Sequence, residues 1–97
     1  MKYNVYHAIN PTFGFGEPLK FPDEYEKVAV VDADSLEDTF RITNHIDKSW
    51  TTNSEVVELI KLHNRSTSVG DIVEDETGVR HLCKPCGWEV IEEMEKQ

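Results

Sequence analysis

Four consecutive apolar residues, Val28–Val31, lie inside an otherwise charged segment of the chain. Short apolar runs rich in β-branched residues are typical of buried strands. We therefore predict a buried strand over Glu26–Asp32. Asp34 or Ser35 then caps a helix, because each is followed three residues later by an acidic residue, as in a capping box. A strand, a short polar turn and a capped helix form a standard packing unit, so the acidic residues here need no catalytic explanation.

The N-terminal residues Lys2–Ile9 also have the pattern of a strand, because successive side chains would point alternately to two faces, and one face would be mainly apolar. The helix that follows the buried strand is expected to end between Asn44 and Asp47. The alternation predicts that one face of the N-terminal strand presents Tyr3, Val5, His7 and Ile9.

A second helix is predicted further along the chain, because Thr52 and Glu55 have the spacing of a capping box. Its apolar side chains would be Val56, Val57, Leu59, Ile60 and Leu62.

Three further strands are predicted, over 69–73, 79–84 and 88–91. A hairpin loop at 74–78 would place Gly78 in the left-handed conformation. Together these elements predict an α+β fold, a single domain over residues 1–97. In it, a small curved, mainly antiparallel sheet packs against two short helices. Residues 92–97 are expected to form a frayed tail.

The chain has 97 residues and a formal net charge of −9, with acidic residues in three clusters. Nucleic-acid binding requires clustered Lys and Arg, so direct binding to a duplex is disfavoured. An acidic surface fits a basic partner, or imitates the phosphate spacing of DNA; alternatively, the charge only keeps a small protein soluble. The clusters contain Asp23, Glu24, Glu26, Asp32, Asp34, Glu37 and Asp38; then Asp71, Glu74, Asp75 and Glu76; then Glu89, Glu92, Glu93 and Glu95.

The start of the chain, Met1–His7, contains no apolar core of a signal peptide. No apolar run approaches the roughly 18 residues that a membrane span needs. We therefore expect a cytoplasmic protein without membrane association. In that reducing compartment a structural disulfide is not expected.

His81, Cys83 and Cys86 form the group closest to a metal-site motif, because the C-x-x-C spacing lets two thiolates bind one zinc ion. A closed zinc site needs four ligands, and no second pair with suitable spacing exists in the chain. The alternative, which we favour, is that the cysteines are small apolar residues of the sheet. A redox pair would need a helix after its first cysteine, whereas Trp88–Ile91 favours a strand. No cofactor is expected.

A polar run before the predicted strand at 69–73 is the best candidate for a binding surface. Arg65 offers a planar donor fork, which suits phosphate, carboxylate or an acidic peptide. Alternatively, the hydroxyl side chains hydrogen-bond their own backbone in a turn. Trp50 would add an exposed anchor, although a Trp at such a junction more often closes the core. The candidate binding residues are Trp50, His63, Asn64, Arg65, Ser66, Thr67 and Ser68.

The segment Arg65–Val73, followed by Gly78 and then Cys86–Ile91, resembles the C-terminal half of small YodL-like proteins. In those proteins a Ser-x-Ser-Val-x-Asp segment leads into a strand, a hairpin and a Gly-aromatic strand. The rest of the chain is similar to uncharacterised short proteins encoded by bacteriophages, plasmids and other mobile elements. The resemblance implies a bacterial or phage setting but no activity, and it weakens the zinc hypothesis, because ordinary strand occupies the position of Cys83 and Cys86.

We therefore predict a non-enzymatic accessory protein of a bacteriophage or mobile element that binds a host macromolecule, most plausibly a protein. One alternative is an acidic DNA mimic that inhibits a DNA-binding defence enzyme. Another is a small metal-binding or redox protein that uses Cys83 and Cys86. A homodimer, with an enzyme site formed between its subunits, also stays open, although no residue pattern argues for it.

Overall fold

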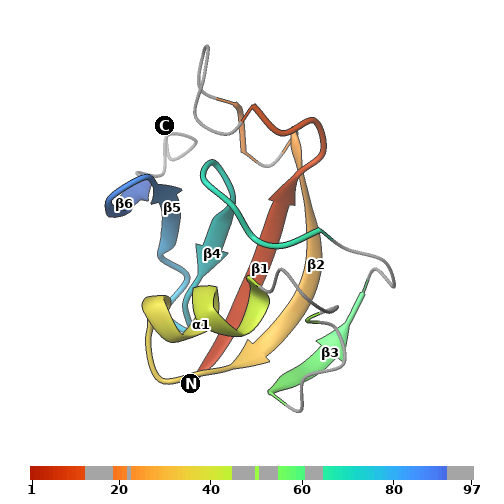
Figure 1. Cartoon of the computed structure of the whole chain (residues 1–97), viewed down its shortest axis with the longest axis vertical. Helices are drawn as coiled ribbons and strands as arrows, with labels where there is room; N and C mark the ends of the chain where they lie inside the picture. The colour runs from red at the N-terminus through yellow and green to blue at the C-terminus, as the bar shows by residue number, and fades with distance from the viewer. Residues whose placement is uncertain (13–18, 22, 45–49, 51–54, 61–64, 92–97) are drawn as a thin grey trace.

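The computed structural model describes residues 1–12, 19–21, 23–44, 50, 55–60 and 65–91. Within these ranges the chain forms strands β1 (Lys2–Ala8), β2 (Tyr25–Asp32), β3 (Val56–Leu59), β4 (Ile72–Glu74), β5 (Arg80–Lys84) and β6 (Gly87–Ile91), and helix α1 (Leu36–Thr43). The strands make one sheet in the order β3-β2-β1-β4-β5-β6 (Figure 1), and every neighbouring pair is antiparallel. Strands β1 and β4 are therefore central, and β3 and β6 are the edges.

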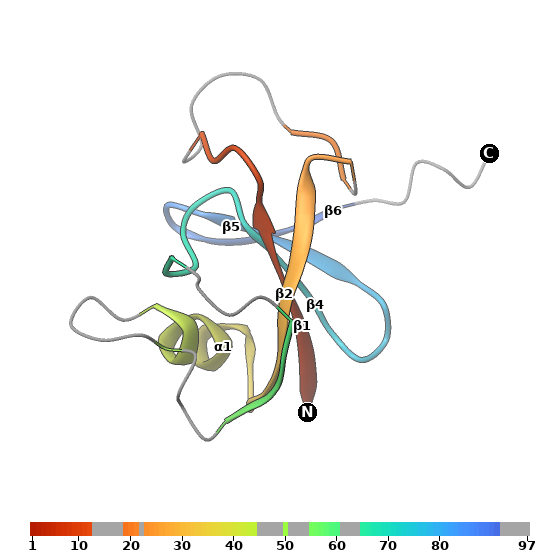
Figure 2. The same ribbon diagram turned by 90° about the vertical axis from the view of Figure 1, so that its right-hand side faces the viewer.

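Helix α1 covers one face of the sheet (Figure 2) and begins at a side-chain cap. Of the two predicted caps, the chain uses Ser35, whose Oγ accepts a hydrogen bond from the Asp38 backbone N–H at 3.0 Å. The Asp38 carboxylate in turn accepts from the Asp34 N–H at 3.1 Å. The first of these bonds satisfies a donor that a helix start leaves without an intrahelical partner. The helix ends at Thr43, one residue before the predicted range of Asn44–Asp47, and Asn44 is its C-cap.

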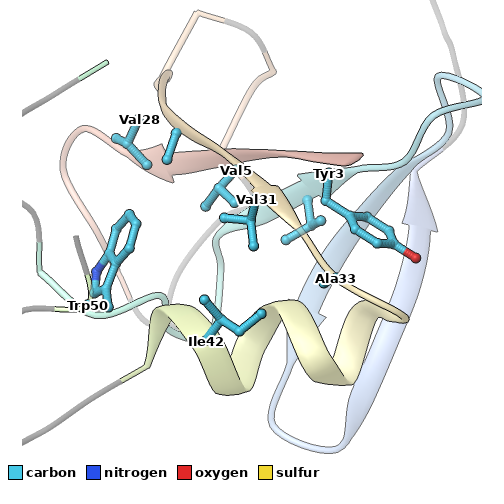
Figure 3. Close-up of a cluster of buried hydrophobic side chains, with 9 residues drawn as sticks. Tyr3, Val5, Val28, Val31, Ala33, Ile42 and Trp50 are labelled. Atoms are coloured by element: carbon cyan, nitrogen blue, oxygen red, sulfur yellow. The ribbon is translucent and has the colours of Figure 1, made fainter. Parts of the chain in front are cut away.

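The main core lies between α1 and the sheet (Figure 3). Ile42 of α1 points toward Val5 and Val31 of the sheet, and Tyr3 and His7 are buried beside them, as the alternation along β1 predicted. Ile9, predicted on the same face, follows the end of β1 and is exposed. The buried members of this core are Tyr3, Val5, Val28, Ala29, Val31, Ala33, Ile42, Trp50 and Val73.

The opposite face of the sheet is covered by a smaller cluster around Phe21. The Phe21 ring packs edge-on against Tyr6, with ring centroids 5.0 Å apart, and lies 5.7 Å from Tyr25. The Arg80 guanidinium stacks over the same ring, 4.6 Å from its centroid. Because both faces are covered here, the central strands are buried on two sides.

The prediction of an α+β fold with two short helices is wrong, because the described residues form a mainly antiparallel sheet with a single helix. The second predicted helix, over 52–62, contains β3 instead. Strand β3 pairs with the outer edge of β2, with Leu59 opposite Ala29 and Val56 opposite Val31. Without this partner, β2 would present unpaired backbone groups, and β-branched valines fit a strand better than a short helix.

The three strands predicted in the C-terminal part of the chain are present as β4, β5 and β6, although β4 begins at Ile72 and not at Val69. Gly78 in the β4–β5 turn has φ 88° and Gly87 after the β5–β6 turn has φ 92°, in the left-handed region that favours glycine. The predicted tail, 92–97, lies outside the described residues. Among the helices that the structure describes, none is long and apolar enough to cross a membrane.

Candidate functional site

The loop that leads into β4 is held by an ion pair between the half-buried Arg65 and the buried Asp71. Arg65 Nη1 lies 2.7 Å from Asp71 Oδ2, and Nη2 lies 2.7 Å from Oδ1, so the pair is bidentate. The same guanidinium donates to the carbonyl oxygens of Ser66 at 3.0 Å and Ala8 at 3.2 Å. The donor fork predicted to bind a ligand is therefore occupied by groups of the protein itself.

The Asp71 carboxylate is only 1% exposed and accepts two further hydrogen bonds from the backbone. The Ala8 N–H donates to Oδ1 at 2.9 Å and the Ser68 N–H donates to Oδ2 at 2.8 Å. A buried carboxylate needs such compensation, because its transfer out of water is costly. Asp71 thereby joins the end of β1 to the loop at 65–70.

His7 and Thr67 extend this cluster to the C-terminus of α1. His7 Nε2 lies 2.9 Å from Thr67 Oγ1 and 4.0 Å from the nearer Asp71 oxygen. The Thr67 N–H donates to the Thr43 carbonyl, and the Asn44 side-chain amide donates to the Thr67 carbonyl. We call the connected residues the polar network: His7, Asn44, Arg65, Thr67, Ser68 and Asp71.

His, Thr and Asp side chains in contact resemble the components of a nucleophilic site, but their burial argues for a structural role. His7, Thr67 and Asp71 are each exposed by 2% or less, so a substrate would have to displace core side chains to reach them. Hydrogen-bonded networks of this kind hold a loop in one conformation.

The structure brings several predicted binding residues together, but inside the protein. Trp50 is 1% exposed, and its Nε1–H donates to the Arg65 carbonyl at 2.9 Å. Thr67 is buried, whereas Arg65, Ser66 and Ser68 are half-buried. His63 and Asn64 lie outside the described residues.

Sequence reasoning missed His7, Asn44 and Asp71 as members of the polar network. The sequence held two signals. His7 lies on the predicted inward face of the N-terminal strand, and Asp71 directly precedes the apolar pair Ile72 and Val73.

The three candidate metal ligands on β5 and its turn differ in their surroundings. His81 Nε2 lies 3.0 Å from Asp75 Oδ2. Cys83 is buried, Cys86 is exposed in the turn, and both thiols are free. Within the described part of the chain, no group of three His, Cys, Asp or Glu residues has the geometry to hold a metal ion.

The two cysteines should differ strongly in reactivity. Burial, followed by the negative charge of Asp71, raises the pKa of Cys83 to about 11. At pH 8 roughly a thousandth of that thiol is thiolate, the reactive form. We expect Cys83 in the Cys86→Ser variant to react with iodoacetamide at least about 100-fold more slowly than Cys86 in Cys83→Ser, as followed by intact mass. Equal rates in the folded variants would contradict this, and equal rates in denaturant are the control.

The β4–β5 turn is built around the Asp75 carboxylate. Burial raises its pKa, but hydrogen bonds from the Thr77 hydroxyl, His81 and the N–H groups of Val79 and Thr77 outweigh burial and lower the pKa to about 2. Because the folded pKa is depressed, this stabilisation is complete above about pH 4 and is lost as the pH falls toward 2.

We predict that Asp75→Asn lowers the unfolding free energy by about 1–2 kcal/mol at pH 7, after allowance for solvent screening. The difference from wild type should shrink below pH 4, where the Asp75 carboxylate of the unfolded wild-type chain becomes protonated while that of the folded protein stays charged until about pH 2. Urea unfolding at pH 7, 5 and 3 measures both quantities. A difference that stayed constant down to pH 3 would show that the charge of Asp75 is not what stabilises the turn.

Carboxylates from two of the three acidic clusters lie at the end of the sheet that holds the N-terminus (Figure 1), where Lys2 pairs with Asp32 and its N–H donates to Glu76 Oε2 at 2.6 Å. Burial raises the pKa of Tyr3, and the negative charges of Asp75, Glu76, Asp34 and Glu37 raise it further. These four residues come from the α1 start and the β4–β5 turn, far apart in sequence. We call them the acidic surface.

Comparison of the chain with protein-family models, curated proteins and solved structures found no match.

Proposed function

We propose that the protein is a non-enzymatic accessory protein of a bacteriophage or mobile element, and that it binds a host protein through the acidic surface. The observation that carries the proposal is that the end of β2 and the start of α1, with Asp34 and Glu37, lie at the same end of the sheet as the β4–β5 turn with Asp75 and Glu76. Three of these carboxylates, Glu37, Glu76 and Asp34, are exposed. A concentrated negative potential steers a basic partner and sets its orientation.

The polar network supports a binding role rather than a catalytic one. The groups that are chemically best suited to catalysis, His7 and Asp71, are buried and bonded within the protein. The phage or mobile-element setting rests on the resemblance of Arg65–Val73 and Cys86–Ile91 to YodL-like proteins.

The same convergence favours a second candidate, an acidic mimic of DNA that inhibits a DNA-binding enzyme. Mimicry requires carboxylates from different segments to share one surface, and the hypothesis is supported by the strand pairing, which brings two of the clusters to one end of the sheet. The two candidates differ in one measurable property. A mimic competes with duplex DNA for its partner and is released by salt, whereas a packed protein interface survives salt better.

The test is capture of partners from a bacterial lysate by the immobilised protein at low and high salt, with identification by mass spectrometry. The variant Glu37→Gln/Glu76→Gln removes two charges from the acidic surface. We expect it to lower the affinity for the captured partner by about ten-fold or more at low salt.

A matched control removes the same charge elsewhere, in Asp23→Asn/Glu89→Gln. Asp23 precedes β2 at the opposite end of the sheet (Figure 1), and Glu89 lies on β6, 3.5 Å from Lys84. If the control weakened capture as much as the test variant, only net charge would matter and the proposal would fail. Release of the partner by added duplex DNA would identify the mimic.

A further inference from the structure

The peptide carbonyl oxygen of Ser66 accepts hydrogen bonds from two side chains that are close to it in sequence. Arg65 Nη1 donates to this oxygen at 3.0 Å, and Ser68 Oγ donates to it at 3.1 Å. A cationic donor and a hydroxyl donor on the same oxygen polarise the carbonyl group, and they stabilise the negative charge that develops when a nucleophile adds to the carbonyl carbon. The Ser66 carbonyl oxygen therefore has the surroundings of an oxyanion hole.

The side-chain hydroxyl of Thr67 is the nucleophile nearest to this carbonyl group. Thr67 supplies the nitrogen of the peptide bond with Ser66, so covalent geometry keeps its Oγ1 close to the Ser66 carbonyl carbon. His7 Nε2 lies 2.9 Å from Thr67 Oγ1 and, in the tautomer with its proton on Nδ1, can take the hydroxyl proton. Asp71 Oδ2 lies 4.0 Å from the same ring nitrogen and stabilises the imidazolium that forms. A nucleophile, a base and two oxyanion donors thus surround one peptide bond.

Burial excludes an external substrate from this cluster, but the peptide bond between residues 66 and 67 is part of the cluster. His7 and Thr67 are exposed by 2% or less. The N–H and the carbonyl group of Thr67 are both hydrogen-bonded to the C-terminal end of α1, which fixes the orientation of the nucleophile. Water has a route to the carbonyl group, because three neighbouring residues are only half-buried: Arg65, Ser66 and Ser68.

We propose that the protein cleaves its own chain between Ser66 and Thr67 by an N–O acyl shift. His7 takes the proton of the Thr67 hydroxyl, and Oγ1 adds to the Ser66 carbonyl carbon. The proton then passes to the Thr67 nitrogen and the C–N bond breaks, which leaves the Ser66 acyl group as an ester on Oγ1. Water hydrolyses this ester to a Ser66 carboxylate and a Thr67 with a free hydroxyl and a free amino group. Hydrolysis and protonation of the amine draw the reaction from the stable amide toward the products.

The two pieces of the cleaved chain, 1–66 and 67–97, stay together in the folded protein. Strand β4 of the second piece is paired with β1 of the first piece. Cleavage is therefore visible only under denaturing conditions, whereas elution from a size-exclusion column does not change. Each molecule reacts once, so this activity is distinct from the turnover of a substrate and from the binding of a partner.

The first measurement is the intact mass of the purified, folded wild-type protein during incubation at pH 8. We expect two fragments, 1–66 and 67–97, whose masses add up to that of the chain plus one water. Hydroxylamine attacks esters, so its presence should leave a hydroxamate on Ser66. The rate should be independent of protein concentration and of protease inhibitors, because the reaction is intramolecular. A chain that stays whole with and without hydroxylamine would overturn the proposal, and so would fragments that end at another bond.

Variants of the nucleophile and the base distinguish self-cleavage from a contaminating protease. Thr67→Ser keeps a hydroxyl group and should cleave within about ten-fold of the wild-type rate, whereas Thr67→Val lacks the nucleophile and should stay whole. His7→Gln should slow cleavage by about 100-fold, as expected for loss of a general base. The matched control is Thr39→Val, at another buried threonine, whose hydroxyl donates to the Ser35 carbonyl. This control should cleave at the wild-type rate.

Circular dichroism shows which variants fold, and only folded variants are compared. Cleavage of folded Thr67→Val at the wild-type rate would contradict the role of the hydroxyl. If Thr67→Val fails to fold, His7→Gln decides in its place, because a folded His7→Gln that cleaves as fast as wild type leaves the reaction without its base.

Discussion

Replacement of Asp71 by Asn will lower the free energy of unfolding by about 3 kcal/mol, the lower end of the cost of breaking a buried ion pair, because the Asp71 side chain is buried and that of Arg65 is 30% exposed. The substitution keeps the volume of the side chain but replaces a carboxylate oxygen with an NH₂ group. That group cannot accept from Arg65, Ala8 or Ser68, all of which donate to Asp71 in the native protein. A domain of this size is stabilised by only roughly 5–15 kcal/mol, so the loss would be readily visible in urea unfolding.

A double-mutant cycle shows whether the loss comes from the ion pair. Arg65→Met leaves the carboxylate without its bidentate partner and should also destabilise strongly. The double variant Arg65→Met/Asp71→Asn should lose less than the two single losses added together, because both changes remove one shared interaction. Asp23→Asn, at an exposed position, is the control and should change stability by no more than about 0.5 kcal/mol. Additive losses, or a loss below about 1 kcal/mol for Asp71→Asn, would show that the pair does not hold the loop.

Local patterns predicted the elements whose partners lie close in sequence. The cap at Ser35, the apolar run of β2 and the glycine of the β4–β5 turn each specify local backbone geometry, and the structure agrees with all three. The prediction of a second helix was wrong because the local pattern there fits both a helix and a strand. Val56 and Leu59, three residues apart, face inward in a helix and also in this strand. The choice depends on the open edge of β2, which is 25 or more residues away and leaves no local trace.

The candidate site shows the same division between local and distant information. Sequence reasoning selected Arg65 as a polar group of interest, but its partners Asp71 and Ala8 could not be assigned without the fold. Asp71 was grouped with Glu74, Asp75 and Glu76 as one acidic cluster. The fold separates them, since Asp71 is buried in the polar network while Asp75 and Glu76 belong to the acidic surface. Grouping by sequence therefore counted Asp71 as a surface carboxylate, although its charge lies inside the protein.

The convergence of Asp34 and Glu37 with Asp75 and Glu76 follows from topology. Strand β2 ends, and α1 starts, at the end of the sheet where β1 begins and where β4 turns into β5 (Figure 1). Antiparallel neighbours place the end of one strand beside the start of the next, so two clusters separated in sequence meet. This step required the pairing of β1 with both β2 and β4, which no local pattern revealed.

Trp50 provides the clearest distinction between a contact residue and a core residue. An exposed anchor could be truncated without loss of stability, and only partner binding would weaken. The structure instead buries the indole in the main core and places its ring 6.0 Å from that of His7. Trp50→Ala should therefore cost about 3–5 kcal/mol of unfolding free energy, as expected for a large buried aromatic residue.

Trp50→Phe separates the two contributions of this side chain. Phenylalanine keeps most of the buried apolar surface but removes the Nε1–H that donates to the Arg65 carbonyl. A hydrogen bond of this kind contributes about 1 kcal/mol, so the variant should lie between wild type and Trp50→Ala in urea unfolding followed by circular dichroism. If Trp50→Ala lost less than about 1 kcal/mol while partner capture fell, Trp50 would be a contact residue after all. If Trp50→Phe equalled wild type, its hydrogen bond would contribute nothing, and packing alone would fix the loop that carries Arg65.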